Sequence, residues 1–254
     1  MNKTITFAKR NFLEMSRDPL SYIFCVALPL VMMVIMTLVN ESVPKNMTIF
    51  QIDNLTGGVV IFGQTFVMLF TALSVATDRG GSFLTRLFAS PMKGSNFTGG
   101  YILPVLLIAE VQIVLDLVCA YVISLITGNT LSIPGMLLLL VTGLPSAVMF
   151  TAVGIIFGTL FNEKSAPGLC SVIISLGSFI GGIWFDAEQT GGVLYKICKC
   201  TPFLYCTKAA RATLKMDFTW DAFFLPMIIV VLSAVALMVL AVFLFKRKMK
   251  ADLA

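Results

Sequence analysis

The chain has 254 residues, of which 58% are apolar and only 12% charged, whereas a soluble domain is about 25% charged. One soluble core cannot hide this much apolar surface, so much of the chain must face lipid. The net charge of +5 is too mild and too dispersed for nucleic-acid binding. The absence of histidine excludes imidazole catalysis and histidine-containing metal sites. We therefore expect no catalytic residues, no metal site and no nucleic-acid partner.

Six apolar runs are long enough to be membrane helices, each of which needs about 20 predominantly apolar residues. Pro104, Pro134 and Pro145 mark expected ends or kinks. We predict an all-α membrane protein whose residues 1–254 form a single transmembrane domain. Its six predicted spans cover residues 20–39, 57–74, 101–126, 134–160, 166–185 and 223–245.

The basic residues predict the orientation of these spans. With six spans, both termini lie on one side of the membrane, and twelve of the 18 basic residues are on that side. The opposite side has six, five of them in the long segment 186–222. Because cytoplasmic loops carry the excess of lysine and arginine, we expect both termini in the cytoplasm and residues 186–222 outside. The predicted location is the cytoplasmic (plasma) membrane of a bacterium.

Residues 79–93, between the second and third spans, have the pattern of a short amphipathic helix. Arg86 lies away from the apolar side of this helix, which is formed by Phe83, Leu84, Leu87, Phe88 and Pro91. Two interpretations stay open from the pattern alone. The helix lies on the membrane surface with Arg86 and Lys93 near anionic head groups, or its apolar side binds a soluble partner.

Three polar residues fall inside the third apolar run. A charge near the centre of a bilayer costs about 2.5 to 3.5 kcal/mol, so such residues usually face protein or water. Gln112 and Asp116 are four residues apart and share one side of a helix, whereas Glu110 and Asp116 do not. A role in a substrate pathway or dimer interface and a structural hydrogen bond to another helix both remain open.

The six cysteines form two groups. Three lie in apolar runs and are expected to be packing residues: Cys25, Cys119 and Cys170. The others, Cys198, Cys200 and Cys206, cluster in one polar segment. A disulfide or a metal site is conceivable there, but three cysteines without a histidine are a weak zinc pattern.

Three motifs, in this order along the chain, resemble the membrane subunit of type-2 ABC transporters, the ABC-2 type permeases. RNFLEMSRDPLSYIFCVALPL at 10–30 resembles the family's interfacial helix with Arg-Asp-Pro, here Arg17, Asp18 and Pro19. RLFASPMK at 86–93 is similar to its Leu-x-x-Ser-Pro stretch, and TPFLYCTKAARATL at 201–214 to the segment before its last span. The family usually has Glu-Arg where this chain has Asp78-Arg79.

The resemblance implies a role for each of these regions. Residues 79–93 would be a cytoplasmic coupling helix that docks on a separate ABC ATPase. Residues 1–19, with Arg10, Arg17 and Asp18, would be an interfacial helix on the inner surface. Segment 186–222, with Pro202, Tyr205 and Arg211, would form short re-entrant helices in the outer leaflet. The family also implies a second permease copy, identical or related.

The energy source is expected in another polypeptide. No glycine in this chain is followed by lysine, so the Gly-Lys-[Ser/Thr] of an ATP-binding P-loop is missing, and ATP and magnesium would be bound by the partner ATPase. We predict the permease subunit of an ATP-driven exporter of an amphipathic substrate such as a drug, an antimicrobial peptide or a lipid-linked molecule. The alternative is an ion-gradient-driven transporter or channel that uses Glu110 or Asp116.

Overall fold

The computed structural model describes residues 3–19, 23–42, 48–81 and 94–252. The described residues form helices joined by short connections, and no strand occurs among them. In chain order the elements are α1 (Lys3–Met15), the π-helical turn η1 (Ile23–Ala27), α3 (Leu28–Ser42), α4 (Ile52–Gly80), α6 (Gly94–Thr127), α7 (Ile133–Thr142), α8 (Leu144–Leu160), α9 (Ala166–Ile180), α10 (Ala187–Thr190), α11 (Gly192–Lys199), α12 (Pro202–Lys215), the π-helical turn η2 (Trp220–Phe224) and α13 (Leu225–Asp252).

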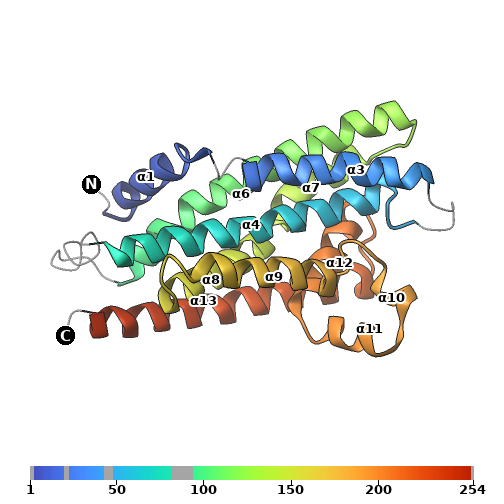
Figure 1. Ribbon diagram of the computed structural model, residues 1–254. Coiled ribbons are helices and arrows are strands. Elements are labelled where there is room, and N and C mark those ends of the chain that lie inside the picture. The colour runs from blue at the N-terminus through green and yellow to red at the C-terminus, as the bar shows by residue number, and fades with distance from the viewer. Residues whose placement is uncertain (1–2, 20–22, 43–47, 82–93, 253–254) are drawn as a thin grey trace.

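The long helices lie along a common direction and form one elongated bundle (Figure 1). α1 and the end of α13 lie at one end of this bundle, together with the end of α4 and the start of α6. We call this the terminal end. The short helices α10 and α11 lie at the opposite end, which we call the far end.

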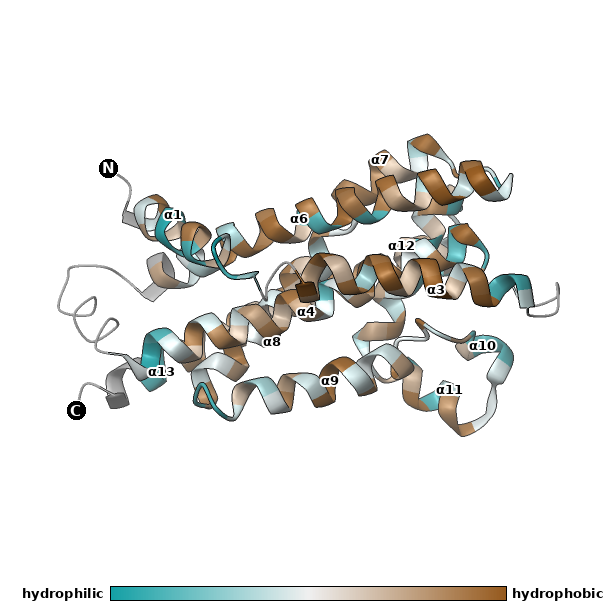
Figure 2. Ribbon diagram, turned by 45° about the horizontal axis from the view of Figure 1, so that its top comes forward, coloured by the Kyte–Doolittle hydropathy of each residue, from teal (hydrophilic) through white to brown (hydrophobic). Residues whose placement is uncertain are grey.

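Five helical stretches among the described residues are long and apolar enough to cross a membrane: Ile23–Ser42, Ile52–Gly80, Phe97–Thr127, Ile133–Leu160 and Trp220–Lys248. Figure 2 shows hydrophobic residues along the middle of the bundle and hydrophilic ones toward its ends. The fifth predicted span falls on α9, which is apolar but has only 15 residues. At 1.5 Å per residue α9 is shorter than the hydrocarbon core of a bilayer, so the count of six spans stays a prediction.

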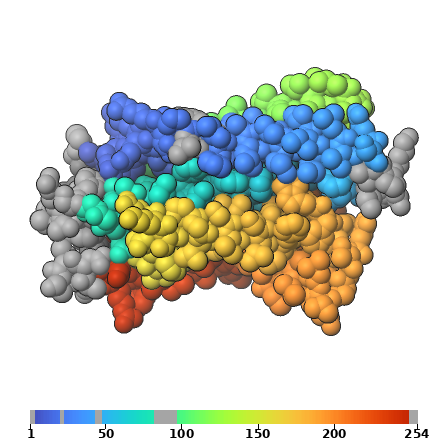
Figure 3. All heavy atoms as spheres, in the orientation of Figure 1, coloured from blue at the N-terminus to red at the C-terminus, as the bar shows by residue number. Residues whose placement is uncertain are grey.

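α4 is the central helix of the bundle. In its most apolar stretch 83% of the residues are buried inside the protein, compared with 17–44% in the other four membrane helices. In Figure 3 it is visible only as a narrow band between α1 and α3 on one side and α8 and α9 on the other. The outer helices expose large apolar side chains instead, such as Leu232 and Val239 of α13. Their exposure suits helices that face lipid.

Small residues bring α4 and α8 into backbone contact. A Cβ atom added at Gly154 would lie 2.5 Å from the Met68 carbonyl oxygen, and one at Gly158 would lie 2.5 Å from the Ala72 carbonyl oxygen. The two glycines are four residues apart and therefore lie on the same side of α8. In lipid, where tails are as apolar as leucine, such close packing is a main source of helix association.

The fourth membrane passage, Ile133–Leu160, consists of two helices that meet beside Pro145, one of the predicted kink positions. α7 ends at Thr142 and α8 begins at Leu144, with Pro145 in its first turn. Proline has no amide hydrogen to donate, so helical hydrogen bonding is interrupted here. Gln64 of α4 donates from Nε2 to the Gly143 carbonyl oxygen at 3.1 Å, and Ser146 Oγ donates to Gln64 Oε1 at 2.6 Å. The break is therefore stabilised from the central helix.

The Gly154 contact can be tested with a single methyl group. Gly154→Ala would drive a Cβ atom into the backbone of α4, and overpacking of this kind costs about 1–3 kcal/mol. We expect a clearly lower thermal unfolding temperature for the purified chain in detergent. Gly168→Ala in α9 is the matched control, because nothing lies within 4 Å of the added Cβ and alanine favours helix by about 0.5–1 kcal/mol. Equal effects of the two substitutions would contradict the close contact.

Candidate functional site

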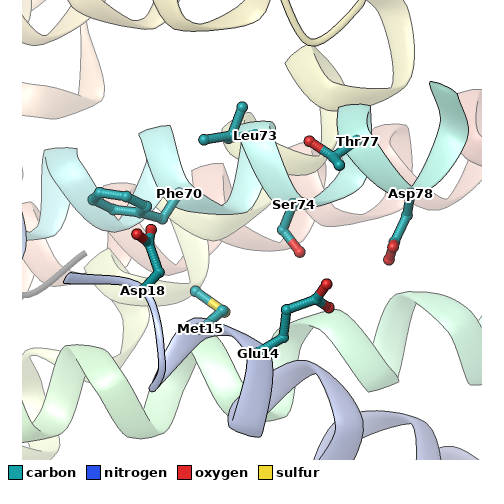
Figure 4. Close-up of a pocket in the computed structure, with 8 residues that line it drawn as sticks. All are labelled: Glu14, Met15, Asp18, Phe70, Leu73, Ser74, Thr77 and Asp78. Carbon is teal, nitrogen blue, oxygen red and sulfur yellow. The ribbon is translucent and has the colours of Figure 1, made fainter. Parts of the chain in front are cut away.

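The terminal end carries a cleft of about 210 Å³ between α4 and the segment formed by α1 and the residues after it. Figure 4 shows Glu14 and Asp18 on one side of this cleft, opposite Ser74, Thr77 and Asp78 of α4. Its apolar lining consists of Met15, Phe70 and Leu73. The cleft places three carboxylates beside the end of the central helix, directly before residues 82–93.

Asp78 is the centre of an ionic network that joins three helices. Arg10 of α1 donates from Nη1 to both carboxylate oxygens of Asp78 at 2.9 Å, and the Tyr101 hydroxyl of α6 donates to Asp78 Oδ2 at 2.7 Å. Arg10 Nη2 also lies 2.7 Å from Glu14 Oε2. The Asp78 side chain is only 6% exposed. A charge this deeply buried requires a partner, because removing one side of a buried ion pair is strongly destabilising.

Packing around this network fixes α1 on α6. Asn11 is fully buried and donates from Nδ2 to the Gly100 carbonyl oxygen at 3.1 Å. The Phe7 ring meets Phe97 and Tyr101 edge to face, with centroids 5.9 and 5.1 Å apart. A Cβ atom at Gly100 would collide with the Phe7 ring, so the glycine permits this close approach.

Arg79, the next residue of α4, holds the end of α8. Its Nη1 donates to the carbonyl oxygen of Gly158 at 3.0 Å and also to that of Thr159. These carbonyls belong to the last turn of α8, where helical partners are missing. A guanidinium at this position also interacts favourably with the negative end of the helix dipole. Arg79 and Asp78 together connect α4 to α1, α6 and α8.

The predicted coupling residues follow Asp78 and Arg79 in the sequence. Phe83, Leu84, Arg86, Leu87, Phe88 and Pro91 fall outside the described residues. The structure describes both flanks: α4 ends at Gly80 and α6 begins at Gly94. In the sequence, residues 82–93 therefore follow closely after Asp78 and Arg79, the residues of α4 that bind Arg10 and the end of α8.

The predicted interfacial helix is divided between two environments. α1 ends at Met15, so Arg17 and Asp18 lie beyond it; Arg17 is exposed and Asp18 lines the cleft. The large apolar residues of α1 do not share one environment. Phe7 and Met15 are buried against the bundle, whereas Phe12 is 38% and Leu13 42% exposed. α1 thus packs on protein with one side and presents apolar residues outward on another.

The polar residues of α6 lie at the contact with α4. Gln112 and Asp116 are fully buried and are hydrogen-bonded to each other. Gln112 Nε2 also approaches the Val60 carbonyl oxygen at 3.4 Å, and its amide occupies the space that a Cβ atom would take at Gly63. Glu110 is half-buried, and one of its carboxylate oxygens has no hydrogen-bond partner among the described residues. The structure does not bring Glu110 together with the Gln112–Asp116 pair.

At the far end Arg211 crosses from α12 to two other elements. Its Nε donates to the Asn54 carbonyl oxygen at 3.0 Å, and its Nη2 donates to that of Ile183 at 3.1 Å. A Cβ atom at Gly57 would lie 2.9 Å from Arg211 Cγ, so the glycine makes room for the arginine. Pro202 begins α12, and the Tyr205 hydroxyl donates to the Lys199 carbonyl oxygen at 3.2 Å.

A surface ion pair connects α12 to α10 in this region. Lys208 of α12 binds Glu188 of α10, and the Tyr195 hydroxyl donates to the same carboxylate at 3.2 Å. The hydrogen bond and charge of Lys208 lower the pKa of Glu188 below its usual value. All six cysteines are free, including Cys198, Cys200 and Cys206, and no group of metal-ligating side chains is found in the described part of the chain.

Sequence reasoning missed three of these contacts. It did not predict the Arg10–Asp78–Tyr101 network, the capping of α8 by Arg79, or the Gln64–Ser146 support of the helix break. For the Gln64–Ser146 contact, the sequence does contain an indication. Gln64 is a polar residue in an apolar run, and Gly143 and Pro145 lie in another. The partners of Asp78 come from distant segments, and no spacing in the sequence points to them.

The fold and this site define a multi-pass helical membrane protein whose central helix is joined at one end to three neighbours. Residues 2–215 match the model of a family described as ABC-2 type transporter. The match covers most of the chain, which therefore belongs to the ABC-2 type transporter family, a family of membrane permeases. A comparison with curated proteins gave no match.

The Asp78 network makes a prediction for stability. Asp78→Asn removes the charge that binds Arg10, and a hydrogen bond to a charged group contributes about 1.5–3 kcal/mol. We expect a markedly lower thermal unfolding temperature for the purified chain in detergent. Asp53→Asn is the matched control: Asp53 lies 3.6 Å from Lys215, and the two side chains are 32% and 41% exposed, so this pair should contribute only about 0–1 kcal/mol. A loss no larger for Asp78→Asn than for the control would contradict the network.

Proposed function

We propose that this chain is the permease subunit of an ATP-driven exporter and that a separate cytoplasmic ABC ATPase binds at the terminal end. The observation that carries the proposal is the Arg10–Asp78–Tyr101 network, with Arg79 on α8, at the point where α4 enters residues 82–93. A partner that pushes on the predicted coupling helix would act directly on the buried central helix of the bundle.

The arrangement of the chain supports a cytoplasmic position for the terminal end. α1 and the end of α13 lie there together, as do both flanks of residues 82–93. These regions carry the excess of basic residues that is typical of cytoplasmic segments. The far end, with α10, α11 and α12, would face the outside.

The mechanism requires that force applied at the terminal end reach the far end. α4 can transmit it because its first turns hold Arg211 and its last turn holds Arg10 and the end of α8. Binding of ATP by the partner would shift the chain between inward-open and outward-open states. α11 and α12 would act as re-entrant helices that cap the exit, and a second permease copy would complete the pathway.

The substrate is expected to be amphipathic, such as a drug, an antimicrobial peptide or a lipid-linked molecule. The outer helices expose apolar surface along their length, so a substrate can approach from the membrane. The family membership supports transport, and the direction and substrate class are part of our proposal.

One observation favours a second candidate function. Asp116 is fully buried, and its Oδ1 atom has no hydrogen-bond partner among the described residues. A gradient-driven transporter could use such a carboxyl as a proton site. Its amide partner and its position at the α4–α6 contact also fit a purely structural role, which agrees with the ATP-driven proposal.

Coupling to an ATPase can be tested by copurification. Phe88→Asp places a carboxylate on the predicted docking surface, where burying it should cost at least about 2 kcal/mol, or about 30-fold in affinity. We expect the tagged variant, purified from its native membranes in mild detergent, to lose the vanadate-sensitive ATP hydrolysis that accompanies the unmodified chain. Phe218→Asp, at an exposed position of the far end, is the control and should retain it.

Two results would contradict the proposal. One is equal ATP hydrolysis with the Phe88→Asp and unmodified chains. The other is solute uptake by vesicles that contain this chain alone, driven by a proton gradient and abolished by Asp116→Asn. The second result would establish the gradient-driven alternative.

A further inference from the structure

A groove of about 420 Å³ lies between the end of α1, the π-helical turn η1 and the middle of α6. Its volume lies within the range of ordinary small-molecule sites, about 300–1,000 Å³. Apart from the hydroxyl of Ser16 and the thiol of Cys25, the described residues that line it are apolar: Phe12, Met15, Ile23, Val26, Ala27, Leu30, Ile108, Val111 and Leu115.

The groove is open to the surface that the protein presents to lipid. Ile23 is 52% and Val111 56% exposed, and both belong to membrane-spanning stretches. The lining of α6 runs from Ile108 to Leu115, which corresponds to about 10 Å along the helix. An elongated, apolar groove at this position fits a hydrocarbon chain that lies parallel to the helices, because empty space would forfeit contact energy.

A cation follows one of the groove's lining residues in the sequence. Arg17 comes directly after Ser16 and is exposed, and it lines a second hollow together with Arg10, Leu13, Glu14, Asp18 and Pro19. Its guanidinium has no hydrogen bond or ion pair with another described residue, whereas Glu14 in the same hollow is already paired with Arg10. A guanidinium binds a phosphate with two parallel hydrogen bonds, more specifically than an ammonium does.

From this combination of apolar groove and free guanidinium we propose that the groove is a phospholipid site. One acyl chain lies between α1, η1 and α6, and the lipid phosphate binds Arg17. The lipid fills the space between the outward side of α1 and the first membrane passage, and so holds α1 against the bundle. This proposal does not depend on the direction of transport or on the ATPase.

The test uses the full chain reconstituted in vesicles that contain a phospholipid with a photoactivatable group on its acyl chain. After irradiation, labelled residues are mapped by mass spectrometry, and we expect labels on residues 12–16, 23–30 and 108–115. Val111→Trp fills the groove and should abolish most of this labelling. Val118→Trp is the matched control: it lies on the same helix, is 55% exposed compared with 56% for Val111, and does not line the groove.

The phosphate contact is tested separately. Arg17→Gln should weaken lipid binding at least about tenfold, as expected for loss of a charge-assisted hydrogen bond, whereas Lys9→Gln, at an exposed cation within α1, should have little effect. A long-chain alcohol with the same photoactivatable tail should label the groove less than the phospholipid does. Equal labelling in Val111→Trp and Val118→Trp, unchanged binding in Arg17→Gln, or equal labelling by the alcohol would each overturn the proposal.

Discussion

The structure depends on the burial of α4. In the most apolar stretch of every other membrane helix fewer than half of the residues are buried, whereas in α4 83% are. The contact of α4 with α8 is so close that backbone atoms of α4 occupy the space that side chains at Gly154 and Gly158 would need. Because protein interiors rearrange between discrete packings rather than deform continuously, a helix packed in this way moves with its neighbours. A change at one end of α4 is therefore transmitted along the bundle.

Three polar contacts fix α4 along its length. Arg211 binds the carbonyl of Asn54 near its start, Gln64 supports the break between α7 and α8 in its middle, and Asp78 binds Arg10 and Tyr101 near its end. In lipid, where water cannot replace a lost partner, such contacts must be satisfied within the protein. Through these contacts α4 is bound to other elements at the terminal end, in the interior and at the far end of the bundle.

Much of the helical layout could be predicted from composition and hydropathy, since runs of about 20 apolar residues have few alternatives in a membrane. Details that depend on tertiary contacts could not be predicted from the sequence. The side of α1 that meets protein was not evident, because Phe7, Phe12, Leu13 and Met15 are all apolar. Only the positions of the neighbouring helices determine that Phe7 and Met15 are buried while Phe12 and Leu13 are exposed. The shorter length of α9 results from the turn at Gly181–Gly182, where Gly182 has a φ of 62°. The partners of Asp78 lie 68 and 23 residues away, beyond the reach of any local pattern.

The central claim is that α1, α4, α6 and α8 form one rigid unit at the terminal end. Spin labels at Ile5→Cys on α1 and Leu160→Cys on α8, both exposed positions, would measure this directly in the complex purified from native membranes, after replacement of the accessible native cysteines. We expect a narrow distribution of distances that ATP does not shift and that Asp78→Asn broadens. A distance that changes with ATP in the intact chain, or a distribution that Asp78→Asn leaves unchanged, would contradict it.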